Sequence, residues 1–194
     1  MPMVGRGWLD TFLTALRHHE AAVRLREAAM AGQLGAWTRA LTDVVVSTLP
    51  TMGWTGASKG HRSTILPVPR QEYLALDVVA FGDSGDRRWR FPAAVFELEN
   101  SRDDDLVAYA MWKTMCVRTG LRVVFCYRRD FFAGVELVER LHTGVMREMG
   151  ASERLALGGE TVLVVGSRDA HDTFPHGFFK TWSFDANIGQ FQKI

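Results

Sequence analysis

Apolar and polar positions alternate with helical spacing at the start of the chain. Between residues 8 and 30 the apolar stripe predicts a helix, formed by Leu9, Phe12, Leu13, Leu16 and Val23. Gly32 and Gly35 interrupt this pattern, and a second stripe predicts a helix over residues 36–49 that ends before Pro50. Residues 51–60 are expected to form a loop.

Short apolar runs and further helical patterns follow this helical pair. We expect strands over residues 63–68 (an edge strand, because prolines bound it), 72–81, 93–100, 121–127 and 161–166, helices over 101–118 and 130–149, and a terminal hairpin or strand over 178–194. Turn residues at 82–86 predict that the strands on either side form a hairpin. The alternation of strands and helices predicts an α/β fold with a mixed sheet flanked by helices.

Two of the predicted strands carry acids where apolar residues are expected. Asp77 interrupts the apolar run of residues 72–81, and Glu97 and Glu99 lie near the end of the next strand. Residues two apart on a strand point to the same side of the sheet, so Glu97 and Glu99 should project together. Burying ionised carboxylates without a partner is costly. The pattern therefore predicts a three-carboxylate site for a hard metal ion, against the alternative of solvated or arginine-paired acids at a strand end.

A lysine lies on the apolar face of the next helix. On a helical wheel, Lys113 falls within the same arc as Leu106, Ala110 and Val117. A lysine there can extend its ammonium to the surface, or it can turn towards the carboxylates, and the spacing leaves both outcomes open.

A glutamate in the first helix poses a similar question. Glu20 falls on the apolar stripe of residues 8–30, which predicts either a fourth carboxylate directed at the metal site or a helix end emerging into solvent. Glu27 on the same stripe favours the second outcome.

Composition limits the function classes. With 194 residues, 47% of them hydrophobic, the chain suits one domain spanning residues 1–194. The formal net charge of +1 neither requires nor excludes a nucleic acid partner. The two cysteines and six histidines show no zinc-ligand spacing, and no GxSxG motif supports a serine hydrolase. No apolar run is long enough to span a membrane and the N-terminus lacks a signal-peptide pattern, so a cytoplasmic protein is expected.

Asp77 on one hairpin strand, Glu97-Leu98-Glu99 on the next and a helix after them resemble the PD-(D/E)xK nuclease superfamily, which has the restriction-endonuclease-like fold. The resemblance covers residues 9–127 and implies that family's α-β-β-β-α-β core, here with an N-terminal helical pair and a C-terminal β extension. It implies that Asp77 and Glu97 bind Mg²⁺, for which Mn²⁺ can substitute.

The chain departs from the family motif at the third position, where Glu99 replaces lysine. In the family such members use the glutamate as a base or ligand, or supply the lysine from the following helix, so the resemblance implies a catalytic role for Glu99, Lys113 or both. The family often has a glutamate on its first helix, and Glu20 resembles that residue.

From these residues we expect a nuclease that uses a metal ion to hydrolyse phosphodiester bonds in nucleic acid. The resemblance favours DNA over RNA as the substrate. Two alternatives remain open at this point: a nuclease-like fold without catalysis that binds nucleic acid or protein, and an interaction protein that dimerises through its aromatic C-terminal segment. Single- and double-stranded substrates, and endo- and exonucleolytic cleavage, are equally compatible with the pattern. Arginines that could contact phosphates are Arg87, Arg88, Arg90, Arg118, Arg122, Arg128 and Arg129.

Overall fold

A seven-stranded β-sheet organises the chain, and its strands lie side by side in the order of the sequence. The computed structural model describes residues 4–61, 63–68, 72–83 and 85–194. The strands are β1 (Trp54–Ser58), β2 (Val78–Gly82), β3 (Ala94–Leu98), β4 (Leu121–Arg128), β5 (Glu160–Ser167), β6 (Phe179–Asp185) and β7 (Gln190–Lys193). Strands β3, β4 and β5 run parallel, whereas the other neighbours pair antiparallel. The sheet is therefore mixed.

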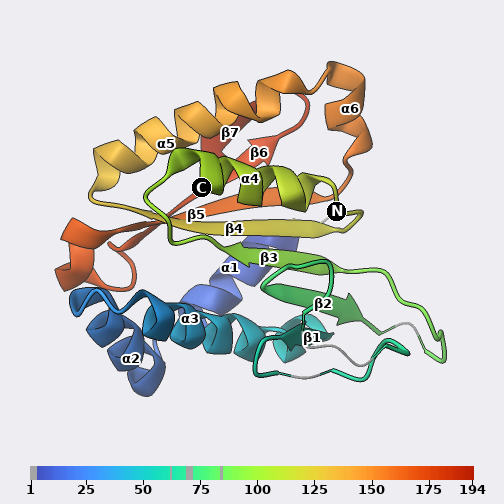
Figure 1. The fold of residues 1–194 in the computed structure, drawn as a ribbon, viewed down its shortest axis with the longest axis horizontal. Coiled ribbons are helices and arrows are strands. Elements are labelled where there is room, and N and C mark those ends of the chain that lie inside the picture. Colours follow the sequence, from blue (N-terminus) through green and yellow to red (C-terminus); the bar gives the residue numbers. More distant parts are fainter. Residues whose placement is uncertain (1–3, 62, 69–71, 84) are drawn as a thin grey trace.

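Helices cover both faces of this sheet (Figure 1). On one face lie α1 (Val4–Ala15), α2 (His19–Met30) and α3 (Leu34–Thr48), and on the other α4 (Asp104–Met115) and α5 (Phe131–Gly144). The short helix α6 (Ala151–Ala156) and the 3₁₀ turns Pro50–Met52, Met146–Glu148 and Arg168–Thr173 belong to the connections. The predicted fold class, a mixed sheet flanked by helices, is confirmed.

Alternating strand residues build a separate core on each face. Towards α1, Phe96 packs on Trp8 and Phe125 packs on Phe12, with ring centroids 5.1 and 5.3 Å apart. Val124 belongs to the opposite core, together with the inner faces of α4 and α5. Because both faces bury apolar surface, the central strands read as continuous hydrophobic runs.

The predicted helix over residues 8–30 is two helices. Helix α1 ends at Ala15 and α2 begins at His19. Between them the main-chain N–H of Arg17 donates to the carbonyl of Thr14, and that of His18 donates to the carbonyl of Ala15. Neither glycine nor proline marks this break in the sequence. It follows from packing, since α1 lies across the sheet whereas α2 packs on α3.

The predicted edge strand also lies elsewhere. The edge is β1, within residues expected to form a loop, and the described residues 63–68 form no strand. Gly56 explains why β1 is inconspicuous in the sequence, because a Cβ there would come within 2.3 Å of Leu49 Cδ1. The absence of a side chain lets the end of α3 pack directly on this strand.

The C-terminal segment forms the hairpin β6–β7, but its aromatic residues do not share one face. Trp182 and Phe184 pack in the core beneath α5, and Phe191 packs against Phe184. Phe178 and Phe179 are buried in the core on the other face. These rings therefore pack against other residues of the same chain. Among the described residues no helix has the length and apolar character to cross a membrane.

Candidate active site

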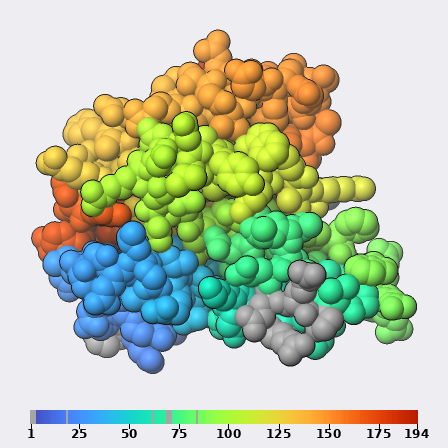
Figure 2. Space-filling model, viewed as in Figure 1, coloured from blue at the N-terminus to red at the C-terminus, as the bar shows by residue number. Residues whose placement is uncertain are grey.

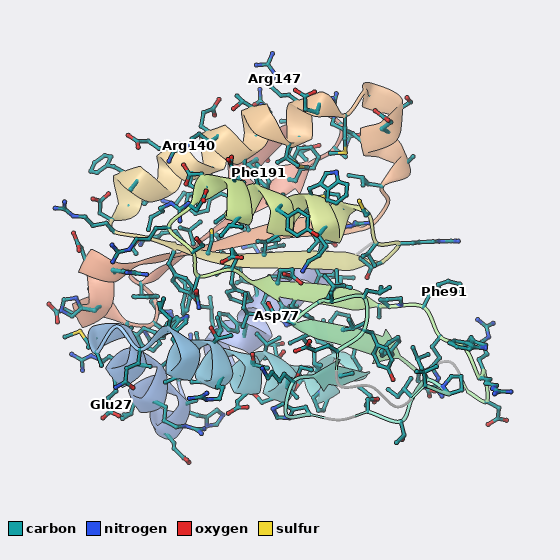
Figure 3. All side chains as sticks on the ribbon, viewed as in Figure 1. Glu27, Asp77, Phe91, Arg140, Arg147 and Phe191 are labelled. Atoms are coloured by element: carbon teal, nitrogen blue, oxygen red, sulfur yellow. The ribbon has the colours of Figure 1, made fainter. Side chains whose placement is uncertain are left out.

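The start of β2 and the end of β3 bring two carboxylates together. Val78 pairs with Phe96, and continuing this antiparallel register by one residue sets Asp77 opposite Glu97. The main-chain N–H of Asp77 donates to Glu97 Oε1 at 3.3 Å, and that of Leu98 donates to Asp77 Oδ2 at 2.7 Å. Each carboxylate is therefore held by the backbone of the other segment. Figure 3 shows Asp77 near the centre of the molecule, at the start of β2.

Helix α4 adds a cation to this pair. Its N-cap is Asp103, whose side chain accepts from the N–H of Asp105, so the helix begins later than the predicted Ser101. From the last turn of α4, the Lys113 ammonium lies 2.9 Å from Glu97 Oε1, and its side chain is only 22% exposed. The structure thus brings Asp77, Glu97 and Lys113 together in one cluster.

Lys113 sits at the edge of the buried face of α4 and not at its middle. The buried residues of the helix are Val107, Ala110, Met111 and Thr114, whereas Leu106 is exposed. The buried face of α4 is therefore rotated away from the apolar arc that the sequence predicts through Leu106 and Lys113. An ammonium at this edge reaches the carboxylates without crossing the core.

A strained turn supplies a second partner for the lysine. Leu74 and Ala75 have φ angles of 60° and 53°, which non-glycine residues adopt infrequently. The turn is closed by a hydrogen bond from the N–H of Leu76 to the carbonyl of Tyr73, and the carbonyl of Ala75 accepts from Lys113 at 2.7 Å. Figure 2 shows this loop against α4 on the face in view. Strain of this kind concentrates at functional sites.

Burial changes the proton affinity of both carboxylates. It raises the pKa of Glu97 from 4.5 to about 7, and the hydrogen bond from Lys113 opposes only part of that rise. Burial also raises the pKa of Asp77, against the hydrogen bond from Leu98. The cluster therefore holds two carboxylates and one ammonium in a poorly solvated place, where further positive charge would favour the ionised forms.

The other two predicted acids make no direct contact with Asp77, Glu97 or Lys113 among the described hydrogen bonds and ion pairs, although the charge of Glu99 contributes to the raised pKa of Asp77. Glu99 is partly buried, and its Oε1 accepts from the N–H of Ser101 at 2.7 Å. Glu20 is exposed in the first turn of α2, because the helix break removes it from the stripe on which its prediction depended. Among the described residues no group of three histidine, cysteine, aspartate or glutamate side chains is arranged to hold a metal ion.

Two carboxylates still fit a magnesium ion chemically. Mg²⁺ prefers oxygen ligands and is commonly bound through one or two carboxylates, with water completing its octahedron. Asp77 and Glu97 supply that donor set, and the burial that raises their pKa values disfavours their ionised forms until a cation binds. The Oε1 atom of Glu99 accepts from Ser101, and its second carboxylate oxygen is the one that would serve as a third ligand.

Asp77 opens onto a pocket of about 610 Å³ between α3 and the segments that follow β1. Its other walls are formed by Gly35, Thr38, Arg39, Thr42, Asp43, Lys59, Gly60, His61 and Glu72. Asp43 and His61 face each other here, with Oδ1 and Nε2 at 2.9 Å. Neither residue is predicted as a site residue from the sequence, because no motif links residue 43 in a helix with residue 61 in a loop. The sequence shows only that one residue is an acid and the other a histidine.

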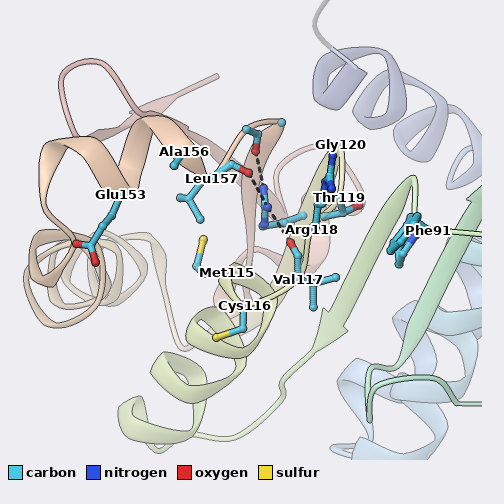
Figure 4. A pocket seen from close by; sticks show the side chains of 14 residues that line it. Phe91, Met115, Cys116, Val117, Arg118, Thr119, Gly120, Glu153, Ala156 and Leu157 are labelled. Atoms are coloured by element: carbon cyan, nitrogen blue, oxygen red, sulfur yellow. Dashed lines mark hydrogen bonds between the residues drawn. The ribbon is translucent and has the colours of Figure 1, made fainter.

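A larger pocket of about 800 Å³ lies beside the C-terminal end of α4 (Figure 4). Arg122 lines it but is almost fully buried, and its guanidinium donates to the carbonyls of Thr114, Val117, Leu157 and Gly158. The one carboxylate in its lining, that of Glu153, accepts from the N–H of Gly150 and caps α6. This pocket therefore lacks the paired acids and lysine of the Asp77 cluster.

The arginines that are predicted to contact phosphates differ in their burial. Arg122 is occupied by main-chain carbonyls, and Arg128 is buried against Asp104, so neither is available at the surface. The exposed members of the group are Arg87, Arg88, Arg118 and Arg129.

Comparisons with known proteins support the fold. No family model and no curated protein matches the chain. The solved structure of NucC from E. coli MS115-1, in its cAAA-bound form, is similar with a TM-score of 0.50 and 15% sequence identity. The match covers 95% of this chain and 81% of that one. At this identity the likeness concerns the arrangement of helices and strands.

Proposed function

We propose that this chain is a metal-dependent nuclease that hydrolyses phosphodiester bonds, with DNA as its substrate in preference to RNA. The observation that carries the proposal is the cluster of Asp77, Glu97 and Lys113 at the end of a mixed sheet. The similar fold of NucC, a nuclease, supports the same class of chemistry. The DNA preference rests on the resemblance to the PD-(D/E)xK superfamily.

Asp77 and Glu97 would hold Mg²⁺, or Mn²⁺ in its place. The bound ion supplies an activated water and neutralises charge on the phosphoryl oxygens. Lys113 keeps the Glu97 carboxylate oriented through its 2.9 Å contact and places positive charge beside the position of the attacked phosphate. It thereby takes the place of the lysine that Glu99 replaces in the family motif. If cleavage does not depend on Lys113, Glu99 is the alternative catalytic residue, as the base that accepts the proton of water.

Metal binding and cleavage test the proposal together. Titration calorimetry with Mg²⁺ and Mn²⁺ should detect binding to the wild type, and a supercoiled plasmid and a labelled single strand should be cleaved only with metal present. Glu97→Gln removes a proposed ligand and should abolish both signals. Glu136→Gln, at an exposed position of α5, is the matched control and should leave both unchanged.

Two outcomes separate the proposal from its rivals. DNA binding without cleavage, at every metal concentration, would favour a nuclease-like fold that acts as a binding module. A protein that binds neither metal nor nucleic acid would contradict the proposed function altogether.

A further inference from the structure

The pocket beside Asp77 contains a histidine oriented by a carboxylate. Asp43 projects from α3, and His61 follows β1 in the chain. His61 is fixed at its backbone by two hydrogen bonds with Ser58, of 2.9 and 3.2 Å, and at its ring by the 2.9 Å contact with Asp43. A carboxylate on one ring nitrogen leaves the other nitrogen as the atom that a bound molecule meets.

The pair adds little to the stability of the fold. The side chains of His61 and Asp43 are 37% and 45% exposed, and an ion pair so open to water contributes at most about 1 kcal/mol. Arg24 approaches Asp43 from α2 at 4.0 Å and is also half exposed. A structural role alone therefore does not explain why the imidazole is held at the pocket wall.

The surroundings of the imidazole suit a phosphodiester. Arg39 of α3 and Lys59 of the preceding loop line the same pocket and are the cations that can meet phosphate oxygens. Glu72 and Asp77 are the carboxylates of the facing segment. The Lys113 ammonium is already engaged by Glu97 and by the carbonyl of Ala75. Imidazole is the side chain that most readily both carries and releases a proton near neutral pH.

We propose that His61 is the general acid that protonates the leaving oxygen during phosphodiester cleavage, and that Asp43 is its positioning residue. This inference rests on the proposed nuclease function. In the step, a bond forms between the water oxygen and phosphorus while the bond from phosphorus to the leaving oxygen breaks. The proton on the His61 nitrogen that faces away from Asp43 passes to that leaving oxygen. The proton of the attacking water passes to the base on the Glu97 side, and both groups re-equilibrate with solvent.

Replacing the leaving oxygen of the substrate with sulfur tests the general-acid role of His61 separately from other roles. The end groups of the wild-type products identify which bridging oxygen leaves, and two oligonucleotides are then compared that differ only in oxygen or sulfur at that atom. A thiolate departs without protonation, so it does not need the acid. His61→Ala should lower cleavage of the oxygen substrate by about 10²-fold or more, the usual contribution of a general acid, and leave the sulfur substrate within about threefold of the wild type.

Further variants separate catalysis from folding. His61→Gln preserves a hydrogen-bonding side chain but cannot serve as the acid, so it should show the same difference between substrates. Added imidazole should restore oxygen-substrate cleavage to His61→Ala. Asp43→Asn should lower cleavage of the oxygen substrate by a smaller factor and spare the sulfur substrate. His171, which pairs with Asp172 at 3.3 Å outside this pocket, provides the matched control as His171→Ala.

Three results would overturn the inference. Equal losses on the two substrates would make His61 a binding or structural residue, and Lys59→Met reproducing the leaving-atom difference would transfer the acid role to that lysine. Unchanged cleavage by His61→Ala would remove the residue from the mechanism. A wild type that cleaves neither substrate overturns the proposed function itself, and this inference with it.

Discussion

Two buried charged groups flank the C-terminal half of α4, and they are satisfied in opposite ways. Arg122 donates to four main-chain carbonyls, and burial lowers the pKa of its guanidinium. Asp77 and Glu97 share a single ammonium, that of Lys113, and burial raises the pKa of each. The charge of Arg122 is satisfied by hydrogen bonds within the fold. The two carboxylates have only one ammonium beside them, so negative charge remains when both are ionised.

The difference separates structure from function. A buried charge that donates four hydrogen bonds to main-chain carbonyls stabilises the segments that it joins, here α4 and the loop before β5. A buried carboxylate pair with too little positive charge lowers stability and gains by binding a cation. Mutations at the two places should therefore have opposite signatures.

The largest expected effect is on catalysis at Lys113. Lys113→Met removes the cation that orients Glu97, and cleavage should fall by about 10²–10⁴-fold while metal binding persists, as activity assays with parallel calorimetry will measure. Lys180→Met, on β6, is the control and should cleave normally. Unaltered cleavage by the Lys113 variant would contradict this orienting role and would make Glu99 the candidate catalytic base.

Arg122 should show the opposite signature. Arg122→Met removes four hydrogen bonds to main-chain carbonyls and should lower the free energy of unfolding by about 3 kcal/mol, measured by urea denaturation. Cleavage per folded molecule should stay near wild type. Arg118→Met changes an exposed arginine of the same pocket and should alter stability by less than about 0.5 kcal/mol. Equal effects of the two substitutions would contradict the assigned anchoring role.

In the metal-free protein, ionisation of Glu97 should lower the free energy of unfolding. Its folded pKa is about 7 against an ordinary 4.5, so the folded state binds more protons between these values and stability is lost as pH rises through that window. Glu97→Gln removes this loss and should raise the free energy of unfolding at pH 8 by up to about 3 kcal/mol. At pH 4 the variant and the wild type should coincide. A gain that is the same at both pH values would show that ionisation is not its cause.

The smallest effect is expected at Glu99. Its Oε1 accepts from the N–H of Ser101, and the side-chain oxygen of Gln can accept the same hydrogen bond. Glu99→Gln should leave stability unchanged and lower cleavage by less than about tenfold, the free-energy equivalent of 1.4 kcal/mol. A loss as large as that of Lys113→Met would place Glu99 among the metal ligands or make it the base.

Much of the architecture was predictable because it depends on short-range patterns. Buried parallel strands such as β4 and β5 appear as continuous apolar runs, and α3 appears as an apolar stripe that ends before a proline. The errors lie where packing overrides local pattern. Helix α1 separates from α2 without a breaker residue, and β1 is a strand because Gly56 admits the end of α3.

The sequence by itself determined the placement of acids at the ends of two adjacent strands and of a lysine on the helix that follows. Alternation along a strand and angular spacing along a helix are local geometry, so they can be read from the order of residues. Only the tertiary structure decided which of these groups meet. The contacts of Lys113 with Glu97 and with the carbonyl of Ala75, and the pairing of Asp43 with His61, each join segments that are distant in the chain. Such contacts depend on how helices pack on the sheet, and no local preference encodes that.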